Sequence, residues 1–270
     1  MNTNSSVKIN NWRKNAISEL KSDGVSSADL DCWLLLEKVV DKPRSHLMAH
    51  EEIELSTDQI QELDGMLADR IKHKPMAYIL GEIEFYGEKF FVDERVLVPR
   101  PETETMIDML KDLKPNALID VGTGSGAIAI IAKKLFPSKE VIAIDNDPKC
   151  LEVAKINAKK HGSNIVMKKN DLLEGLAILD GMVILANLPY VPDDFGINKA
   201  ALNEPHQAIF GGKDGLDLYR KLFAQLKRKA VIVLTESMPP QHKKLDQIAK
   251  NNGFEQTKES DFIQQFEPIA

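Results

Sequence analysis

The stretch ALIDVGTGSGAIAIIAKKLF, residues 117–136, decides the fold class that this chain is expected to adopt. It begins with an apolar run typical of a buried strand, turns through three glycines and ends in an apolar segment of helical character. EVIAID, residues 140–145, follows as a second short apolar strand. A strand, a helix and a second strand in this order predict an α/β fold, in which helices cover both faces of a parallel sheet.

The same alternation continues toward the C-terminus. Further strands are expected at 164–169, 183–187 and 230–237, helices at 148–161 and 216–229, and a closing antiparallel pair at 254–260 and 262–268. The predicted sheet therefore extends over the whole second half of the chain.

The first third of the chain has a different pattern. Residues 11–80 carry apolar residues at helical spacing, with a helix cap expected at Ser56 or Thr57 and no strand-like alternation. Residues 83–98 alternate around Gly87, which indicates a hairpin. We therefore predict three parts: an all-helical domain at 1–80, a hairpin linker at 81–98 and the α/β domain at 99–270.

The glycine turn is suited to bind a ligand. Glycines at 122, 124 and 126 let the backbone approach a ligand closely, and the helix that follows points free N–H groups at it. The dinucleotide fingerprint spaces its glycines as G-x-G-x-x-G, whereas here the third glycine comes one residue early. Asp145, at the end of the second strand, is placed to accept hydrogen bonds from both hydroxyls of a ribose. Ribose binding without a pyrophosphate cradle favours S-adenosylmethionine over a nicotinamide cofactor.

Purely structural roles are the alternatives for these acidic residues. The loop and Asp145 could form a tight turn with a helix-capping carboxylate, although Asp147 and Pro148 are better placed for that cap. Asp171, after the third strand, could face an adenine ring or cap the next helix.

The stretch VILANLPYVP, residues 183–192, ends a strand in an unusual way, with Asn187, Leu188, Pro189 and Tyr190. If the first and fourth strands are neighbours, Asn187 lies beside the glycine loop. An amide or aromatic amino nitrogen is a weak nucleophile, and two acceptors can position it and stabilise its developing charge. The Asn187 side-chain oxygen and the carbonyl of Leu188 are the acceptors we expect, with the Tyr190 ring on the face of a planar group. A strand-ending turn with a packed tyrosine is the alternative interpretation.

Composition limits the possible partners. The formal net charge is -6, which speaks against a protein held mainly by phosphate contacts. Two distant cysteines and scattered histidines indicate no metal site and a reduced compartment. The polar N-terminus, MNTNSSVKIN, has no secretory apolar region, and no apolar run is long enough for a membrane span. We expect a cytoplasmic protein without a membrane partner.

Several segments together resemble the release-factor glutamine methyltransferases, which modify the glutamine of the Gly-Gly-Gln loop of peptide chain release factors. They are residues 72–104, DVGTGSGAIAI at 120–130, IAIDNDP at 142–148, NLPY at 187–190 and NEPHQAIFGGKDGLDLYR at 203–220. The resemblance covers most of the chain, and its first and last segments are the most specific. It implies a class I methyltransferase fold, Rossmann-like with a seven-stranded, mostly parallel sheet, preceded by a helical domain that docks the release factor.

The resemblance also implies roles for individual residues. Binding of S-adenosylmethionine is implied for Gly122, Thr123, Gly124, Ser125, Gly126, Asp145, Leu172 and Asn187, beside the possible contact from Asp171. Binding of the substrate glutamine is implied for Asn187, Leu188, Pro189 and Tyr190. Arg100, Thr103, Glu104, Glu204 and Pro205 would shape or border the site, although the first three could simply begin a helix. A monomer that binds no nucleic acid directly is expected.

Leu188 departs from the family, whose usual tetrad is Asn-Pro-Pro-Tyr. Asn-Leu-Pro-Tyr resembles the tetrad of the ribosomal RNA adenine dimethyltransferases. The change keeps the carbonyl of residue 188, the amide and the ring, so it puts substrate identity in question and not the pair of acceptors. An N6-adenine methyltransferase acting on RNA or DNA is therefore the alternative activity, and a protein that binds release factor or cofactor without turnover is a third.

Overall fold

The computed structural model describes residues 7–227 and 229–269. The first six residues of the polar N-terminus, and Arg228 of the predicted helix 216–229, lie outside the described residues. The chain divides into two compact units. The first, which we call the helical unit, runs to Gly81 and also includes Asn198–Asn203. The second, which we call the sheet unit, comprises Glu82–Ile197 and the chain from Glu204 onward, so the predicted linker at 81–98 is grouped with the sheet from Glu82 on.

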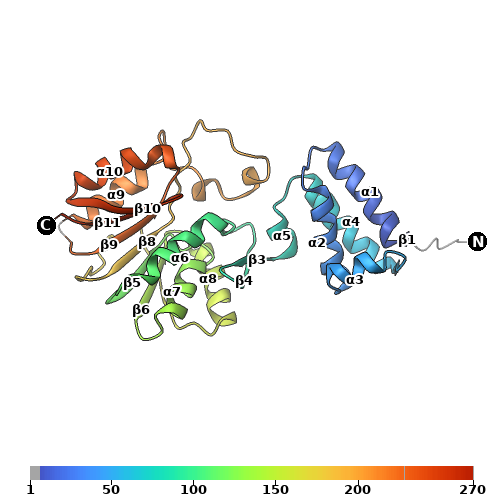
Figure 1. Ribbon diagram of the computed structural model, residues 1–270, viewed down its shortest axis with the longest axis horizontal. Helices are drawn as coiled ribbons and strands as arrows, with labels where there is room; N and C mark the ends of the chain where they lie inside the picture. The colour runs from blue at the N-terminus through green and yellow to red at the C-terminus, as the bar shows by residue number, and fades with distance from the viewer. Residues whose placement is uncertain (1–6, 228, 270) are drawn as a thin grey trace, which may run out of the picture. The chain divides into compact units, whose positions relative to one another are not determined.

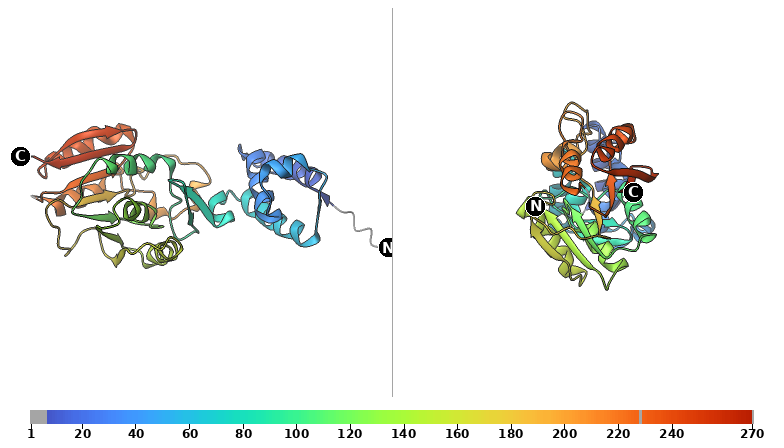
Figure 2. Two further views of the ribbon diagram at one scale, coloured as in Figure 1. Left: turned by 60° about the horizontal axis from the view of Figure 1, so that its bottom comes forward. Right: turned by 90° about the vertical axis from the view of Figure 1, so that its left-hand side faces the viewer.

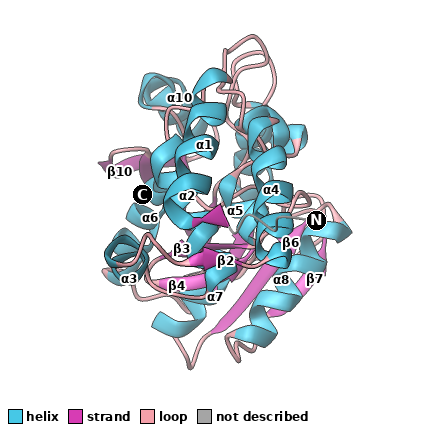
Figure 3. Ribbon diagram, turned by 90° about the vertical axis from the view of Figure 1, so that its right-hand side faces the viewer, coloured by secondary structure: helices cyan, strands magenta, loops and turns pink. Residues whose placement is uncertain are grey.

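The helical unit is a bundle around its own apolar core (Figure 3). Its helices are α1 (Ile9–Ser22), α2 (Ala28–Val40), α3 (Arg44–Ala49), α4 (Thr57–Ile71) and α5 (Met76–Leu80). Ser56 caps α4 in a capping box: its side chain accepts the Gln59 N–H at 3.2 Å, and the Gln59 side chain accepts the Ser56 N–H at 3.0 Å. The cap at Ser56 is confirmed.

One expectation for this unit is wrong. The unit is not all-helical, because β1 (Val7–Lys8) pairs antiparallel with β2 (Glu54–Leu55). A pairing of two residues on each strand is too short to produce an alternating pattern in the sequence.

The sheet unit is built on the predicted seven-stranded, mostly parallel sheet (Figure 1). Its strands are β5 (Ala117–Val121), β6 (Glu140–Asp145), β7 (Val166–Lys169), β8 (Val183–Ala186), β9 (Ile232–Glu236), β10 (Phe254–Ser260) and β11 (Ile263–Pro268). The strand order is β10-β11-β9-β8-β5-β6-β7. β11 pairs antiparallel with both β9 and β10, so the predicted closing antiparallel pair is confirmed.

Helices cover both faces of the sheet (Figures 1 and 2). The helices of this unit are α6 (Glu104–Lys111), α7 (Ala127–Leu135), α8 (Pro148–Lys160), α9 (Asp217–Leu226) and α10 (His242–Lys250). Along β8, Val183 and Leu185 pack into the core that α6 and α7 cover. Ile184 and Ala186 pack into the opposite core, which α9 and α10 cover. β8 is thus buried on both faces, which explains its unbroken apolar run.

The hairpin is shorter than predicted. β3 (Glu82–Phe85) pairs with β4 (Glu88–Phe91), and the chain from 92 to 98 forms no strand. The N–H of Val98 donates to the Glu204 carboxylate at 3.0 Å, where a strand would have used it in a ladder. The helix predicted at PRPETE begins as the 3₁₀ turn η1 (Pro101–Thr103), and α6 follows it directly.

Candidate active site

The glycine loop and Asn187 lie at neighbouring strand ends. β5 and β8 are adjacent and parallel, with Val121 opposite Ala186 at their carboxyl ends. The expected neighbourhood of the first and fourth strands is therefore confirmed. Gly122 has φ +71°, and a Cβ built on it would come within 3.1 Å of the Leu188 side chain. The loop and the Asn-Leu-Pro-Tyr tetrad consequently form one packed corner of the sheet.

A cavity of about 760 Å³, open at its mouth, lies at this corner. Nine of the predicted site residues line it: Gly122, Gly124, Asp145, Asp171, Leu172, Asn187, Leu188, Pro189 and Pro205. Its other lining residues include Leu97, Val121, Ile144, Asn146 and Leu218. Most of the proposed cofactor contacts thus converge on one space.

A second, smaller cavity of about 410 Å³ lies next to the first. The predicted site residues that line it are Arg100, Thr103, Gly122, Thr123, Gly124, Ser125 and Asn187. Asn187 and the two glycines therefore border both spaces. The smaller cavity reaches the segment 99–103 that leads into α6.

Asp145 is held rigidly at the large cavity. One of its oxygens accepts the Gly124 N–H and the other accepts the Asp147 N–H, each at 3.0 Å. Burial raises the pKa of Asp145, against the effect of these backbone donors. A carboxylate has about four acceptor positions, so two hydroxyls of a ligand can still bind to it. Asp147, not Asp145, caps α8, as the sequence suggested.

Leu172 and Asp171 lie at the third strand end of this cavity. The Asn170 side chain donates to the carbonyl of Leu172 at 2.9 Å and to that of Glu174 at 3.0 Å, which holds Leu172 at a positive φ of 48°. Residues 172–175 form a turn and not a helix, so the capping interpretation of Asp171 is wrong. Asp171 is exposed at the cavity.

Gly126 has a different position from the other loop residues. It borders neither of the two cavities. A Cβ on Gly126 would lie 3.1 Å from the Ala154 Cβ, so the glycine permits close packing of α7 on α8. The structure thus gives Gly126 a packing role, and its expected cofactor contact stays a prediction.

The tetrad presents its acceptors in a defined direction. The Asn187 side-chain nitrogen donates to the Thr103 hydroxyl at 3.0 Å, which leaves the Asn187 side-chain oxygen as an acceptor. The Tyr219 hydroxyl donates to the backbone carbonyl of Glu236 and accepts the Leu188 N–H at 3.2 Å. Its single proton is therefore used, and the Leu188 carbonyl, 3.5 Å from this hydroxyl, keeps its acceptor capacity.

Tyr190 is held at both ends. Its hydroxyl donates to the Glu236 side chain at 3.0 Å, and its backbone carbonyl accepts from the Gln241 side chain at 2.7 Å. Burial and the nearby Glu236 raise the pKa of Tyr190 far above its ordinary value, so the hydroxyl stays protonated. The ring is half-buried against the core beneath the sheet end, and it lines neither of the two cavities.

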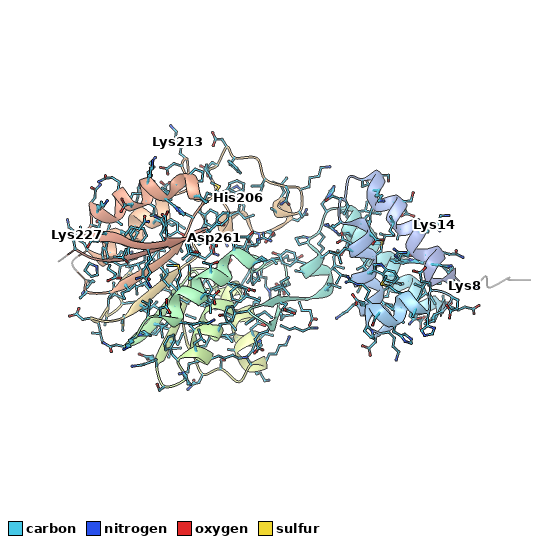
Figure 4. The ribbon with its side chains drawn as sticks, viewed as in Figure 1. Lys8, Lys14, His206, Lys213, Lys227 and Asp261 are labelled. Atoms are coloured by element: carbon cyan, nitrogen blue, oxygen red, sulfur yellow. The ribbon has the colours of Figure 1, made fainter. Side chains whose placement is uncertain are left out.

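The segment from Glu204 to Gly215 braces the tetrad from behind. Val191, directly after the tetrad, makes two backbone hydrogen bonds to this segment: its N–H donates to the Ile209 carbonyl, and its carbonyl accepts the Gly211 N–H. A Cβ on Gly211 would lie 2.2 Å from the Pro189 carbonyl oxygen, so only glycine fits. The 3₁₀ turn η3 (His206–Ala208) belongs to this segment, and the His206 ring, labelled in Figure 4, packs on that of Phe210 with centroids 4.4 Å apart.

Two carboxylates expected at the substrate serve as braces here. Buried Glu204 accepts the Val98 N–H and binds the Arg100 guanidinium at 2.5 Å, so it ties the segment 98–100 to its own loop. Glu104 accepts the Tyr86 N–H at 2.8 Å, at the tip of the hairpin. Neither carboxylate lines either of the two cavities.

Sequence reasoning missed two buried carboxyl groups. Burial raises the pKa of Asp120, in β5, to about 7, and that of Glu236, at the end of β9, also to about 7. Asp120 accepts the Thr123 hydroxyl at 2.6 Å and the Ala129 N–H at 3.2 Å, so it supports the glycine loop from below. An acid inside an apolar strand was the only signal for either residue.

Among the described residues, no three His, Cys, Asp or Glu side chains gather as a metal site would require.

Comparisons with known proteins agree with this geometry. Residues 11–81 match the family model described as the PrmC N-terminal domain, and residues 114–264 match one described as a methyltransferase domain. The chain is 36% identical over 221 residues to the release factor glutamine methyltransferase of Koribacter versatilis, covering 78% of each chain. It is 34% identical over 255 residues to that of Dictyoglomus turgidum, covering 89% of this chain and 88% of the relative.

A solved structure shares the fold at low sequence identity. The catalytic domain of hMettl16, in complex with a MAT2A 3'UTR hairpin, superposes with a TM-score of 0.53 at 14% identity, covering 82% of this chain and 84% of that one. This superposition, the match to the methyltransferase domain and the seven-stranded sheet together confirm the predicted class I methyltransferase fold. In the described ranges, no helix is long and apolar enough to cross a membrane.

Proposed function

Because the chain belongs to the release factor glutamine methyltransferase family, we propose that it methylates the side-chain nitrogen of the glutamine in the Gly-Gly-Gln loop of peptide chain release factors. The methyl donor in this proposal is S-adenosylmethionine. The observation that carries it is the orientation of Asn187, whose side-chain oxygen is left free to accept at the junction of the two cavities.

The lining of the large cavity suits the chemistry of S-adenosylmethionine. Gly122 and Gly124 expose backbone with no side chain in the way, and the Asp145 carboxylate retains acceptor capacity for ribose hydroxyls. Leu172 and exposed Asp171 line the same cavity as Asp145, which supports their proposed contact with the adenine base. Bound there, the cofactor supplies a methyl group on a positively charged sulfur.

The chain's own residues position the substrate nitrogen. In the proposal, the Asn187 side-chain oxygen and the Leu188 carbonyl accept the two N–H bonds of the glutamine amide. These acceptors aim the nitrogen lone pair and favour the partial positive charge that it gains. They are preorganised, because Thr103 fixes the Asn187 amide and Tyr219 binds the Leu188 N–H. The protonated amide product is strongly acidic, so no strong base is required.

The proposal extends to partners and location. The helical unit docks the release factor, and the chain acts as a monomer without direct contact to nucleic acid. Release factors act on ribosomes, so the chain works in the cytoplasm. The acidic net charge of -6 supports a protein substrate over RNA or DNA.

One labelling experiment tests the activity. Radiolabelled cofactor is supplied with the protein and one of three acceptors: a release factor, its Gly-Gly-Ala variant, or ribosomal RNA. We expect label in the release factor alone, and none in the Gly-Gly-Ala variant. Label in RNA alone would establish the adenine alternative in place of glutamine methylation.

A further inference from the structure

Glu236 is a buried acid that makes a direct hydrogen bond to the tetrad, through Tyr190. It is fully buried at the carboxyl end of β9, next to β8 in the sheet. Its Oε1 atom accepts the Tyr190 hydroxyl at 3.0 Å. Its Oε2 atom makes no hydrogen bond to a described residue, yet the Thr103 hydroxyl and the Asn187 amide lie near enough to stabilise the charge on the carboxylate. A buried acceptor left in this way is costly unless it has a use.

The Thr103 hydroxyl links Glu236 to Asn187. Thr103 is 2% exposed and accepts a hydrogen from the Asn187 side-chain nitrogen. A hydroxyl that accepts this bond is free to donate its own proton elsewhere, and an ionised Glu236 can only accept. No hydrogen bond within 3.5 Å joins Thr103 to Glu236 in the structure, so the chain closes only when the two side chains approach each other. Asn187 then donates to Thr103, and Thr103 donates to Glu236.

We propose that Glu236 is a positioning residue whose carboxylate sets the direction of this chain, so that Asn187 turns its nitrogen toward Thr103 and its oxygen toward the substrate amide. The inference rests on the proposed function, because it explains how the acceptor at Asn187 is kept in place. Glu236 also binds the Tyr190 hydroxyl, so a single carboxylate orients the first and last residues of the tetrad.

Protonation of Glu236 would remove this direction. A protonated acid donates to Thr103, the hydroxyl can then donate to the Asn187 oxygen, and the amide is free to turn over. The ionisable groups that act on Glu236 are Glu102, Tyr190 and Tyr219, and the charge of Glu102 opposes ionisation. Burial places the Glu236 pKa at about 7. Turnover should therefore be full above this pH and decrease as the pH falls through it.

The variants are chosen to separate direction from packing. Glu236→Gln keeps the size of the side chain but adds a donor. Thr103→Val removes the linking hydroxyl and Thr103→Ser restores it. Thr235→Val is the matched control, because Thr235 is the fully buried neighbour on the same strand and its hydroxyl makes no hydrogen bond to a described residue.

Turnover and KM are measured for the release factor, and affinity is measured for S-adenosylhomocysteine. We expect Glu236→Gln and Thr103→Val each to lower kcat about 10-fold to 100-fold, the loss typical of a misaligned reacting group. KM and cofactor affinity should stay within about threefold of the unmodified values. Thr103→Ser should recover most of the loss, Thr235→Val should show none, and the double variant should lose no more than either single one.

The pH dependence of kcat distinguishes this role of Glu236 from a purely structural one. The acidic limb of kcat should be present in the unmodified protein and absent in Glu236→Gln. Normal turnover in Glu236→Gln, or equal damage from both Thr103 variants, would overturn the inference. If Glu236→Gln fails to fold, the two Thr103 variants decide the question. An unmodified protein that does not label the glutamine would refute the proposed function itself, an outcome distinct from loss of the chain of hydrogen bonds.

Discussion

Asn187 is the residue at which the two cavities and the tetrad meet, and its replacement tests the proposed acceptor directly. In Asn187→Ala the substrate nitrogen loses one of two acceptors. We expect kcat to fall about 10²-fold to 10³-fold, as for other preorganised groups that stabilise charge in the transition state. Cofactor affinity, measured by calorimetry, should change only modestly, because Asp145 and the glycine loop are untouched. Near-normal turnover would contradict the acceptor role.

Asp120 makes a prediction about stability and pH. Its folded pKa is raised by burial from 3.8 to about 7, so the folded state holds this proton more tightly than the unfolded state does. The contribution of Asp120 is therefore most favourable below about pH 4 and is lost as the pH rises to about 7.

Asp120→Asn removes that dependence. The free energy of unfolding is measured for both proteins by urea titration between pH 4 and pH 8. The value for Asp120→Asn minus the value for the unmodified protein should increase by up to about 1.4 kcal/mol per pH unit as the pH rises. The difference should level off above pH 7. Parallel curves for the two proteins would show that Asp120 ionises in the folded state at its ordinary pKa.

Single site residues at the ends of strands are predicted from the sequence better than residues that hold those site residues in place. Asn187 and Asp145 follow apolar strands, so topology alone brings them to one cavity. Glu104 looked equally suited to the site, yet its carboxylate binds the hairpin tip. Glu236 gave no motif, because its role depends on a hydroxyl and an amide that are distant in the chain. Such tertiary hydrogen bonds leave no local pattern.

The loop between β8 and α9 packs so closely on the tetrad that a glycine is required at the contact. In Gly211→Ala the new Cβ would lie 2.2 Å from the Pro189 carbonyl oxygen, so backbone must move. We expect a loss of about 1–3 kcal/mol in stability, comparable to other overpacked sites. Turnover should fall further than cofactor affinity, because the displaced element carries the substrate acceptors.

Gly65→Ala is the control for the glycine change. Gly65 is exposed inside α4, and among the described residues nothing lies within 4 Å of the place that an alanine Cβ would take. Alanine should stabilise this helix by about 0.5–1 kcal/mol and leave turnover unchanged. Thermal melts and kcat are measured for both variants. If Gly211→Ala lowers neither the stability nor kcat, the loop does not hold the tetrad in place.

Secondary structure was predicted correctly where the pattern of apolar residues extended over many residues. The alternation of apolar strands and helices from β5 to β9 was predicted because β5, β6, β8 and β9 each place side chains in the cores on both faces of the sheet. Only the edge strand β7 is largely exposed. The hairpin was predicted too long because residues 92–98 keep an apolar alternation while Glu204 takes the Val98 N–H. The β1–β2 pair was missed because it contains only two residues on each strand.

For the whole molecule, the decisive feature is that each unit has cores of its own. The helical unit is built around one cluster, and the sheet unit around two clusters on opposite faces of the sheet. The sequence predicted a change of architecture near residue 80 from a change in apolar periodicity. It could not show that Asn198–Asn203, far along the chain, is grouped with the helical unit, because the Asn203 side chain reaches the carbonyls of Lys72 and His73 only after folding.

Separate cores predict separate unfolding transitions, and the two tryptophans make them distinguishable. Trp12 and Trp33 both belong to the core of the helical unit, so their fluorescence reports that unit alone. The large cavity lies wholly within the sheet unit. A ligand that binds only the folded state at about 100 times its Kd stabilises that state by about 2.7 kcal/mol.

S-adenosylhomocysteine at this concentration should therefore raise the calorimetric transition of the sheet unit by roughly 5–10 °C. The fluorescence transition should not move. Asp145→Ala is the control: by removing the proposed ribose acceptor it should abolish most of the calorimetric shift at the same ligand concentration. If the fluorescence and calorimetric transitions instead rise together by the same amount, the two units unfold as one cooperative body, because stabilisation at the cavity would then reach the tryptophans through their coupling.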